Sequence, residues 1–291
     1  MSGRRRITAL LLAAGVSLVA GVASAQQRIV SVSGALTEIV YALGAGDRLV
    51  GVDTTSTWPA ATAQLPSVGY QRALSSEGIL SLSPTLVLMT EDAGPPEVLE
   101  HLRGADIELV RVVEPPSPDG IVGRIRDVAA ALQLDAAGEA LVERVNREIG
   151  RIPPAAATRP RVVFLLDIGR GAPVAAGRDT LADAAIALAG GDNVFARDFE
   201  GFRAVGPESL LAAAPDVVLL TSRTLDVLGG EQGVLALPGI RQTPAGQRGR
   251  IIAMDGLYLL GFGPRTPQAI RELAERWADL SQISAVSAGS R

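Results

Sequence analysis

The sequence predicts an α/β protein with two Rossmann-like lobes, whose parallel central sheets are joined by a long rigid α-helix. Three observations lead to this expectation. Short apolar strands alternate with helices, which is typical of parallel βαβ units. The strand cores are apolar without alternation between polar and apolar residues, so both faces of each sheet are expected to be covered. The alternation stops at a long amphipathic helix and then starts again.

The first 25 residues have the three-part pattern of a secretory signal peptide. Three Arg at 4–6 precede an uncharged apolar run at 7–22, and Ala-Ser-Ala at 23–25 supplies small residues for cleavage after Ala25. The apolar run is short for a membrane span. The Arg triplet leaves open whether the Sec or the twin-arginine route is used, although Thr8 fits the second poorly. We therefore expect export to the periplasm.

The N-terminal lobe is expected to cover residues 26–118. Each apolar strand in it is followed by a helix or by a loop rich in Pro and Gly. The expected strands are 28–32, 49–52, 85–89 and 108–113, and the expected helices are 35–43, 75–82 and 95–103.

A helical connector is expected at 119–157. It begins with an amphipathic helix at 119–132, and Asp135 is expected to cap the helix that follows. That second helix places its apolar residues on one stripe and ends before Pro153. A helical link of this kind is stiff.

The C-terminal lobe, 158–291, repeats the pattern. Strands are expected at 161–166, 216–220 and 250–254, and helices at 180–188, 208–213 and 266–280. An internal repeat relates residues 69–88 to 201–220, with Glu77 and Glu208 each seven residues before a Pro. The repeat predicts two similar lobes. Loops at the carboxyl ends of their strands would form a cleft between them.

Composition removes much of the usual catalytic chemistry. The 291 residues include no Cys and one His, and all 27 basic residues are Arg. These absences exclude disulfides, thiolate chemistry, multi-His metal sites and lysine-based catalysis. Loss of the signal Arg residues makes the mature chain more acidic than the −4 of the whole sequence, which disfavours nucleic acid as a partner. Composition therefore favours binding over catalysis.

Four motifs carry a family resemblance: GYQRALSSEG at 69–78, AGRDT at 176–180, LPGI with TPAG at 237–246, and LLGFGPR at 259–265. With them the chain resembles the cluster A (class III) periplasmic binding proteins of ABC importers, and more narrowly their haem-binding members. The resemblance implies a protein that is not an enzyme and that captures haem b (hemin). It implies delivery to an ABC permease dimer of the inner membrane, with a TonB-dependent outer-membrane haem receptor upstream.

The same resemblance assigns Tyr70 as the axial ligand of the haem iron. Phenolate oxygen is a hard ligand that suits ferric iron. Arg72 lies two residues away, on the same side of an extended segment, where its charge would stabilise the phenolate. The stretch at 167–173, where some relatives carry a His ligand, contains none, so five-coordinate iron is expected.

Six further side chains have the chemistry to contact a haem. Arg pairs bidentately with carboxylates and so suits haem propionates, whereas aromatic rings line or flank a porphyrin. Each of these side chains has an ordinary structural role as its alternative. They are Arg170, Arg178 and Arg265 for the propionates, and Tyr258, Phe202 and Phe262 for the ring.

Glu77 and Glu208 occupy equivalent points of the repeat, which suits docking to the two permease subunits. The structural alternative is a carboxylate favoured at the start of a short helix. Two other functions stay open at this point: a ferric-siderophore or cobalamin carrier of the same fold, and a periplasmic hydrolase using His101. The hydrolase lacks a G-x-S-x-G nucleophile motif.

Overall fold

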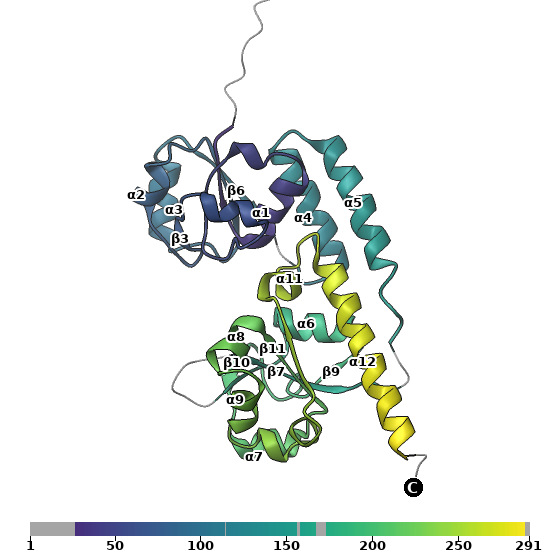
Figure 1. Cartoon of the computed structure of the whole chain (residues 1–291). Helices are drawn as coiled ribbons and strands as arrows, with labels where there is room; N and C mark the ends of the chain where they lie inside the picture. The colour runs from purple at the N-terminus through teal and green to yellow at the C-terminus, as the bar shows by residue number, and fades with distance from the viewer. Residues whose placement is uncertain (1–26, 114, 156–157, 167–172, 289–291) are drawn as a thin grey trace, which may run out of the picture.

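The computed structural model describes residues 27–113, 115–155, 158–166 and 173–288, with side chains up to residue 278. It has two α/β lobes, joined along one side by the helices α4, α5 and α12 (Figure 1). Among these residues no helix is long and apolar enough to cross a bilayer. The two-lobed α/β prediction is confirmed, whereas the predicted signal peptide lies outside the described residues.

The N-terminal lobe is built on a parallel four-stranded sheet in the order β2-β1-β5-β6. Its strands are β1 (Ile29–Val32), β2 (Leu49–Val52), β5 (Leu86–Thr90) and β6 (Glu108–Val112). A separate antiparallel hairpin consists of β3 (Gly69–Tyr70) and β4 (Ala73–Leu74). The sequence did not predict this hairpin, because two-residue strands carry no periodicity.

The C-terminal lobe has a six-stranded sheet with the main order β10-β8-β7-β11-β12. β7, β11 and β12 are parallel, while β8 and β10 add an antiparallel edge and β9 pairs with β7. The strands are β7 (Arg161–Leu166), β8 (Val174–Ala176), β9 (Asp192–Asn193), β10 (Phe202–Ala204), β11 (Val217–Thr221) and β12 (Ile251–Met254).

Helices fill the connections between the strands. In the N-terminal lobe they are α1 (Gly34–Ala42), α2 (Ser76–Leu80) and α3 (Pro96–Arg103), with 3-10 turns at Gly46–Arg48 and Ala60–Gln64. In the C-terminal lobe they are α6 (Leu181–Leu188), α7 (Pro207–Ala213), α8 (Ser222–Val227), α9 (Glu231–Ala236), α10 (Pro244–Gln247), α11 (Gly256–Leu260) and α12 (Thr266–Ala288), with a 3-10 turn at Ile240–Gln242.

The connector is a helical hairpin of α4 (Pro118–Ala131) and α5 (Asp135–Ile149). α4 packs against α1, and α5 packs against both α4 and α12. The predicted cap is wrong: Leu134 holds the N-cap position, and Asp135 is the first helical residue. Its carboxylate still lies in the first turn, where the helix dipole favours it.

One hydrophobic cluster runs through both lobes. It joins buried residues of the first sheet and α1, such as Ile29 and Leu36, to Val145 of α5 and to Phe164 and Trp277 of the second lobe. Because protein interiors are close-packed, a change in the angle between the lobes would disturb this cluster. The packing therefore favours a fixed arrangement of the lobes.

Candidate functional site

The carboxyl ends of the parallel strands in both sheets lead to the region where the lobes face each other. β12 leads into α11, which lies between the lobes in Figure 1, and β2 leads into the loop at 53–58. In open α/β sheets this end of the strands carries the ligand site. The ligand site is therefore expected at this end of each lobe.

Tyr70 projects from the β3–β4 hairpin, which lies on the side of its lobe facing the C-terminal lobe (Figure 1). The hairpin is fixed by backbone hydrogen bonds: Thr54 N donates to Gly69 O, and Gly94 N donates to Gln71 O. The φ of Gly69 is +94°, a conformation that L side chains rarely adopt. Tyr70 itself is 43% exposed, so its phenol is presented on a rigid loop and is open to a ligand.

Arg72 stands beside the Tyr70 phenol and is paired with Asp92 on the loop after β5. Asp92 is the main cause of the raised pKa of Arg72, and the charge and hydrogen bonding of Tyr70 raise it further. The guanidinium is thus held between a carboxylate and the phenol. Sequence reasoning identified Arg72 and missed Asp92, because the two are twenty residues apart.

The C-terminal lobe presents Arg178 and Phe202. Arg178 pairs with Glu200 and lies near Asp179, so its charge is already balanced by exposed carboxylates. Phe202, on β10, is among the exposed large apolar side chains. Arg170 lies outside the described residues. β8 runs antiparallel to β7, so Arg178, which follows the last residue of β8, lies toward the amino end of β7 and away from the strand carboxyl ends. This placement argues against its expected contact with a propionate, whereas the exposed ring of Phe202 remains a candidate for the porphyrin.

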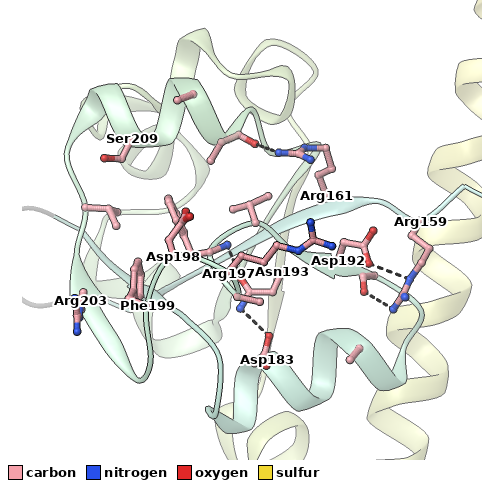
Figure 2. A pocket seen from close by; sticks show the side chains of 18 of the residues that line it. Arg159, Arg161, Asp183, Asp192, Asn193, Arg197, Asp198, Phe199, Arg203 and Ser209 are labelled. Carbon is pink, nitrogen blue, oxygen red and sulfur yellow. Dashed lines mark hydrogen bonds and ion pairs between the residues drawn. The ribbon is translucent and has the colours of Figure 1, made fainter.

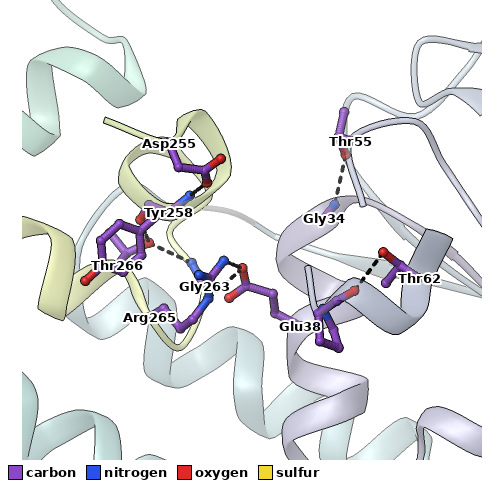
Figure 3. A network of polar contacts seen from close by, with 10 residues as sticks. Gly34, Glu38, Thr55, Thr62, Asp255, Tyr258, Gly263, Arg265 and Thr266 are labelled. Carbon is purple, nitrogen blue, oxygen red and sulfur yellow. Dashed lines mark hydrogen bonds and ion pairs between the residues drawn. The ribbon is translucent and has the colours of Figure 1, made fainter. Parts of the chain in front are cut away.

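A third group of residues joins the two lobes (Figure 3). Arg265 donates through Nε to Glu38 Oε1 of α1 at 3.1 Å, and a second nitrogen of the guanidinium also contacts this oxygen. The guanidinium lies over the rings of Trp58 and Tyr258, at 4.4 and 5.2 Å from their centroids. Arg265 therefore binds Glu38 of the other lobe and stacks on two aromatic rings. This arrangement argues against the expectation that Arg265 binds a haem propionate.

Glu38 is deeply buried, with a side chain only 4% exposed. Burial raises its pKa, and the hydrogen bond and charge of Arg265 oppose that rise. Glu38 and Arg265 therefore form a largely buried ion pair, in which Arg265 stabilises the negative charge of the Glu38 carboxylate. Sequence reasoning missed both Glu38 and Trp58, because nothing along the chain relates them to Arg265.

Tyr258 and Phe262 are poor candidates for the ligand site in this conformation. The Tyr258 hydroxyl donates to Glu272 at 2.9 Å. Burial and then this hydrogen bond raise the pKa of Tyr258 to about 12, which disfavours a phenolate. Phe262 is 0% exposed, and its carbonyl oxygen accepts a hydrogen bond from Arg124. Its ring is a core residue with no face free for a porphyrin, which corrects the expectation.

A recess of about 950 Å³ lies elsewhere on the C-terminal lobe (Figure 2). It is lined by residues at the start of β7 and along β9, which is the opposite end of the sheet from the strand carboxyl ends. Several of its polar side chains pair with one another, as in Arg159 with Asp192 and Asn193 with Asp183. The recess is therefore separate from the region around Tyr70.

Glu77 and Glu208 are both exposed, in the first turns of α2 and α7. His101 is on α3 and lies 3.5 Å from Ser76 Oγ through Nδ1. Within the described residues no group of three His, Cys, Asp or Glu side chains could hold a metal ion.

The fold and the placement of these residues at the strand ends define a two-lobed binding protein. The family model described as "Periplasmic binding protein" matches residues 29–257, and the chain belongs to this family. Membership indicates a periplasmic location and confirms the family predicted from the motifs.

Particular relatives are named for their ligands. The chain is 45% identical to the periplasmic heme-binding protein RhuT from Roseiflexus sp. RS-1, with a TM-score of 0.84 over 88% of this chain and 99% of that one. For the periplasmic heme-binding protein HutB of Vibrio cholerae the identity is 35% and the TM-score 0.78, over 88% and 98% of the two chains. The vitamin B12-binding protein of Yersinia pestis is 29% identical over 74% of this chain and 76% of its own length. These relatives are binding proteins, in agreement with the expectation that the chain is not an enzyme.

Proposed function

We propose that this protein captures haem b between its two lobes and delivers it to an inner-membrane ABC permease. The observation that carries the proposal is the exposed Tyr70 phenol beside Arg72, in a chain 45% identical to a heme-binding protein of the same fold. Phenolate suits ferric iron, and a guanidinium beside it stabilises the anion. Cleavage after Ala25 would release the carrier into the periplasm, downstream of a TonB-dependent receptor.

Tyr70 supplies the iron ligand in this proposal, and Arg72 holds the charge next to it. The pair Arg72–Asp92 keeps the guanidinium in place before the ligand arrives, which lowers the ordering cost of binding. Phe202, exposed on the opposite lobe, would contact the porphyrin. Glu77 and Glu208 would each meet one permease subunit.

Absorption spectroscopy tests the iron ligand. Hemin added to the mature protein should give a phenolate-to-iron charge-transfer band, and Tyr70→Phe should remove it and weaken binding by about tenfold or more. Tyr258→Phe is the matched control, because this phenol is bonded to Glu272, and it should leave the band intact. A Tyr70→Phe protein that keeps the wild-type band and affinity would show that another group holds the iron.

Cobalamin is the second candidate, favoured by the 29% identity to a vitamin B12-binding protein. The same protein should therefore be titrated with cyanocobalamin in a calorimeter. Micromolar or tighter binding of cyanocobalamin together with no hemin spectrum would replace the haem proposal. The higher identity to heme-binding structures favours haem.

A further inference from the structure

Each lobe exposes a leucine on the same helix as its glutamate, three residues further along. Leu80 follows Glu77 on α2, and Leu211 follows Glu208 on α7. Residues three apart on a helix are neighbours on its surface. Each helix therefore places a carboxylate and an apolar side chain next to each other.

The two helices are equivalent in three dimensions as well as in sequence. α2 leads into β5 and α7 leads into β11, and each of these strands lies next to the parallel edge strand of its sheet, with β5 between β1 and β6 and β11 between β7 and β12. The residues after the helices match too: Ser83 has φ +46° and Ala214 has φ +40°, and a Pro follows each. Such left-handed residues are uncommon outside glycine. The match shows that the two surfaces are two copies of one feature.

The two leucines are exposed, whereas the residue before each of them is buried in the core. Ile79 and Leu210, the residues just before them, are both 0% exposed and anchor the helices. Leu80 is 37% exposed and Leu211 is 44% exposed. A single exposed leucine on a protein surface is ordinary. Exposure at the same position of both copies, beside a carboxylate in each, indicates a shared role on the surface.

The glutamates are free to meet a partner. Both are exposed, and in the part of the chain that the structure describes neither forms an ion pair. The two copies lie on different lobes, with α2 on the left side of the N-terminal lobe and α7 at the lower end of the C-terminal lobe in Figure 1. A partner that meets both at once would therefore span the molecule and offer two equivalent contact points.

We propose that Leu80 and Leu211 are the apolar anchors of a two-point docking surface, each entering a recess on one subunit of the dimeric permease. This inference rests on the proposed function and extends it from the two glutamates to the side chains that exclude water around them. Apolar anchors surrounded by polar contacts are the usual centres of binding energy. The carboxylates would orient the protein on the permease and raise the association rate constant. The leucines would lower the dissociation rate constant of the complex.

Binding of the haem-loaded full-length mature protein to the haem ABC permease of the same organism, held in lipid nanodiscs, tests the inference. Leu80→Ser and Leu211→Ser should each weaken binding about fivefold through faster dissociation, and the double variant about 25-fold, because distant sites add. Raising the salt from 50 to 500 mM should reduce the effect of Glu77→Gln and Glu208→Gln. The leucine effects should persist. Leu181→Ser on α6 is the control, with a parent side chain that is also 37% exposed.

Hemin titration and light scattering separate the possible failures. Wild-type protein that does not bind hemin would remove the proposed function. Leucine variants that bind hemin normally and the permease with wild-type affinity would overturn the docking inference alone. A wild-type dimer that becomes monomeric in the leucine variants would show that a second copy of the chain covers this surface, and would also overturn it.

Discussion

Replacing Arg265 by Met should destabilise the protein in a manner that depends on pH. The change removes the partner of Glu38, whose side chain is 4% exposed, while the aliphatic part of the new side chain still packs between Trp58 and Tyr258. Breaking a buried ion pair by removing one partner costs about 3–5 kcal/mol. Because Arg265 is itself 26% exposed, we expect about 3 kcal/mol at pH 7.5.

The sign of the pH effect follows from Glu38. Burial already raises its pKa above the 4.5 of an unfolded chain, and Arg265 works against that rise. Without Arg265 the pKa of the folded variant rises further. Between pH 4.5 and that higher pKa the folded variant holds a proton that the unfolded chain lacks, so its stability increases as the pH falls. Each pH unit in this window returns up to about 1.4 kcal/mol.

Urea unfolding followed by tryptophan fluorescence at pH 7.5 and pH 5.0 measures this effect. The loss should shrink from about 3 kcal/mol to about 1 kcal/mol, since the uncompensated carboxylate becomes neutral. Adding Glu38→Gln should remove most of the pH dependence. Arg103→Met, which disrupts only an exposed pair with Glu100, is the control and should show little change at either pH. An equal loss for Arg265→Met at both pH values would refute the reasoning.

Three further predictions concern the ligand, the lobes and the N-terminus. Arg72→Ala should shift acid-induced hemin release to a pH about one unit higher, because the phenolate loses its stabilising cation; an unchanged release curve would assign Arg72 a structural role only. Small-angle scattering with and without hemin should give radii of gyration within about 0.5 Å, because the shared core and the Glu38–Arg265 pair hold the lobes. A larger compaction on loading would show hinge closure. Mass spectrometry of exported protein should find Gln26 as the first residue; material that begins at Met1 would contradict the signal peptide.

The sequence alone determined the features that local periodicity encodes. The alternation of apolar strands and helices predicted the parallel sheet of the first lobe and the parallel strands β7, β11 and β12 of the second, but not the antiparallel edge formed by β8 and β10. The repeat around Glu77 and Glu208 predicted two equivalent units. The family motifs led to Tyr70 and Arg72, which lie close together because two residues of one hairpin need no distant contacts to meet. Short elements such as β3 and β10 escaped prediction, since two or three residues show no period.

Tertiary structure decided which candidate side chains are free. Arg265 is separated from Glu38 by 227 residues, so only the docking of the lobes could show that its charge is already used. The burial of Phe262 and the bond from Tyr258 to Glu272 likewise depend on how α11 and α12 pack. Asp92 belongs to the site because it forms an ion pair with Arg72, and the spacing of the two residues in the sequence does not predict this contact. Exposure and ion pairing are properties of packed surfaces, and a chain defines those surfaces only once distant segments have met.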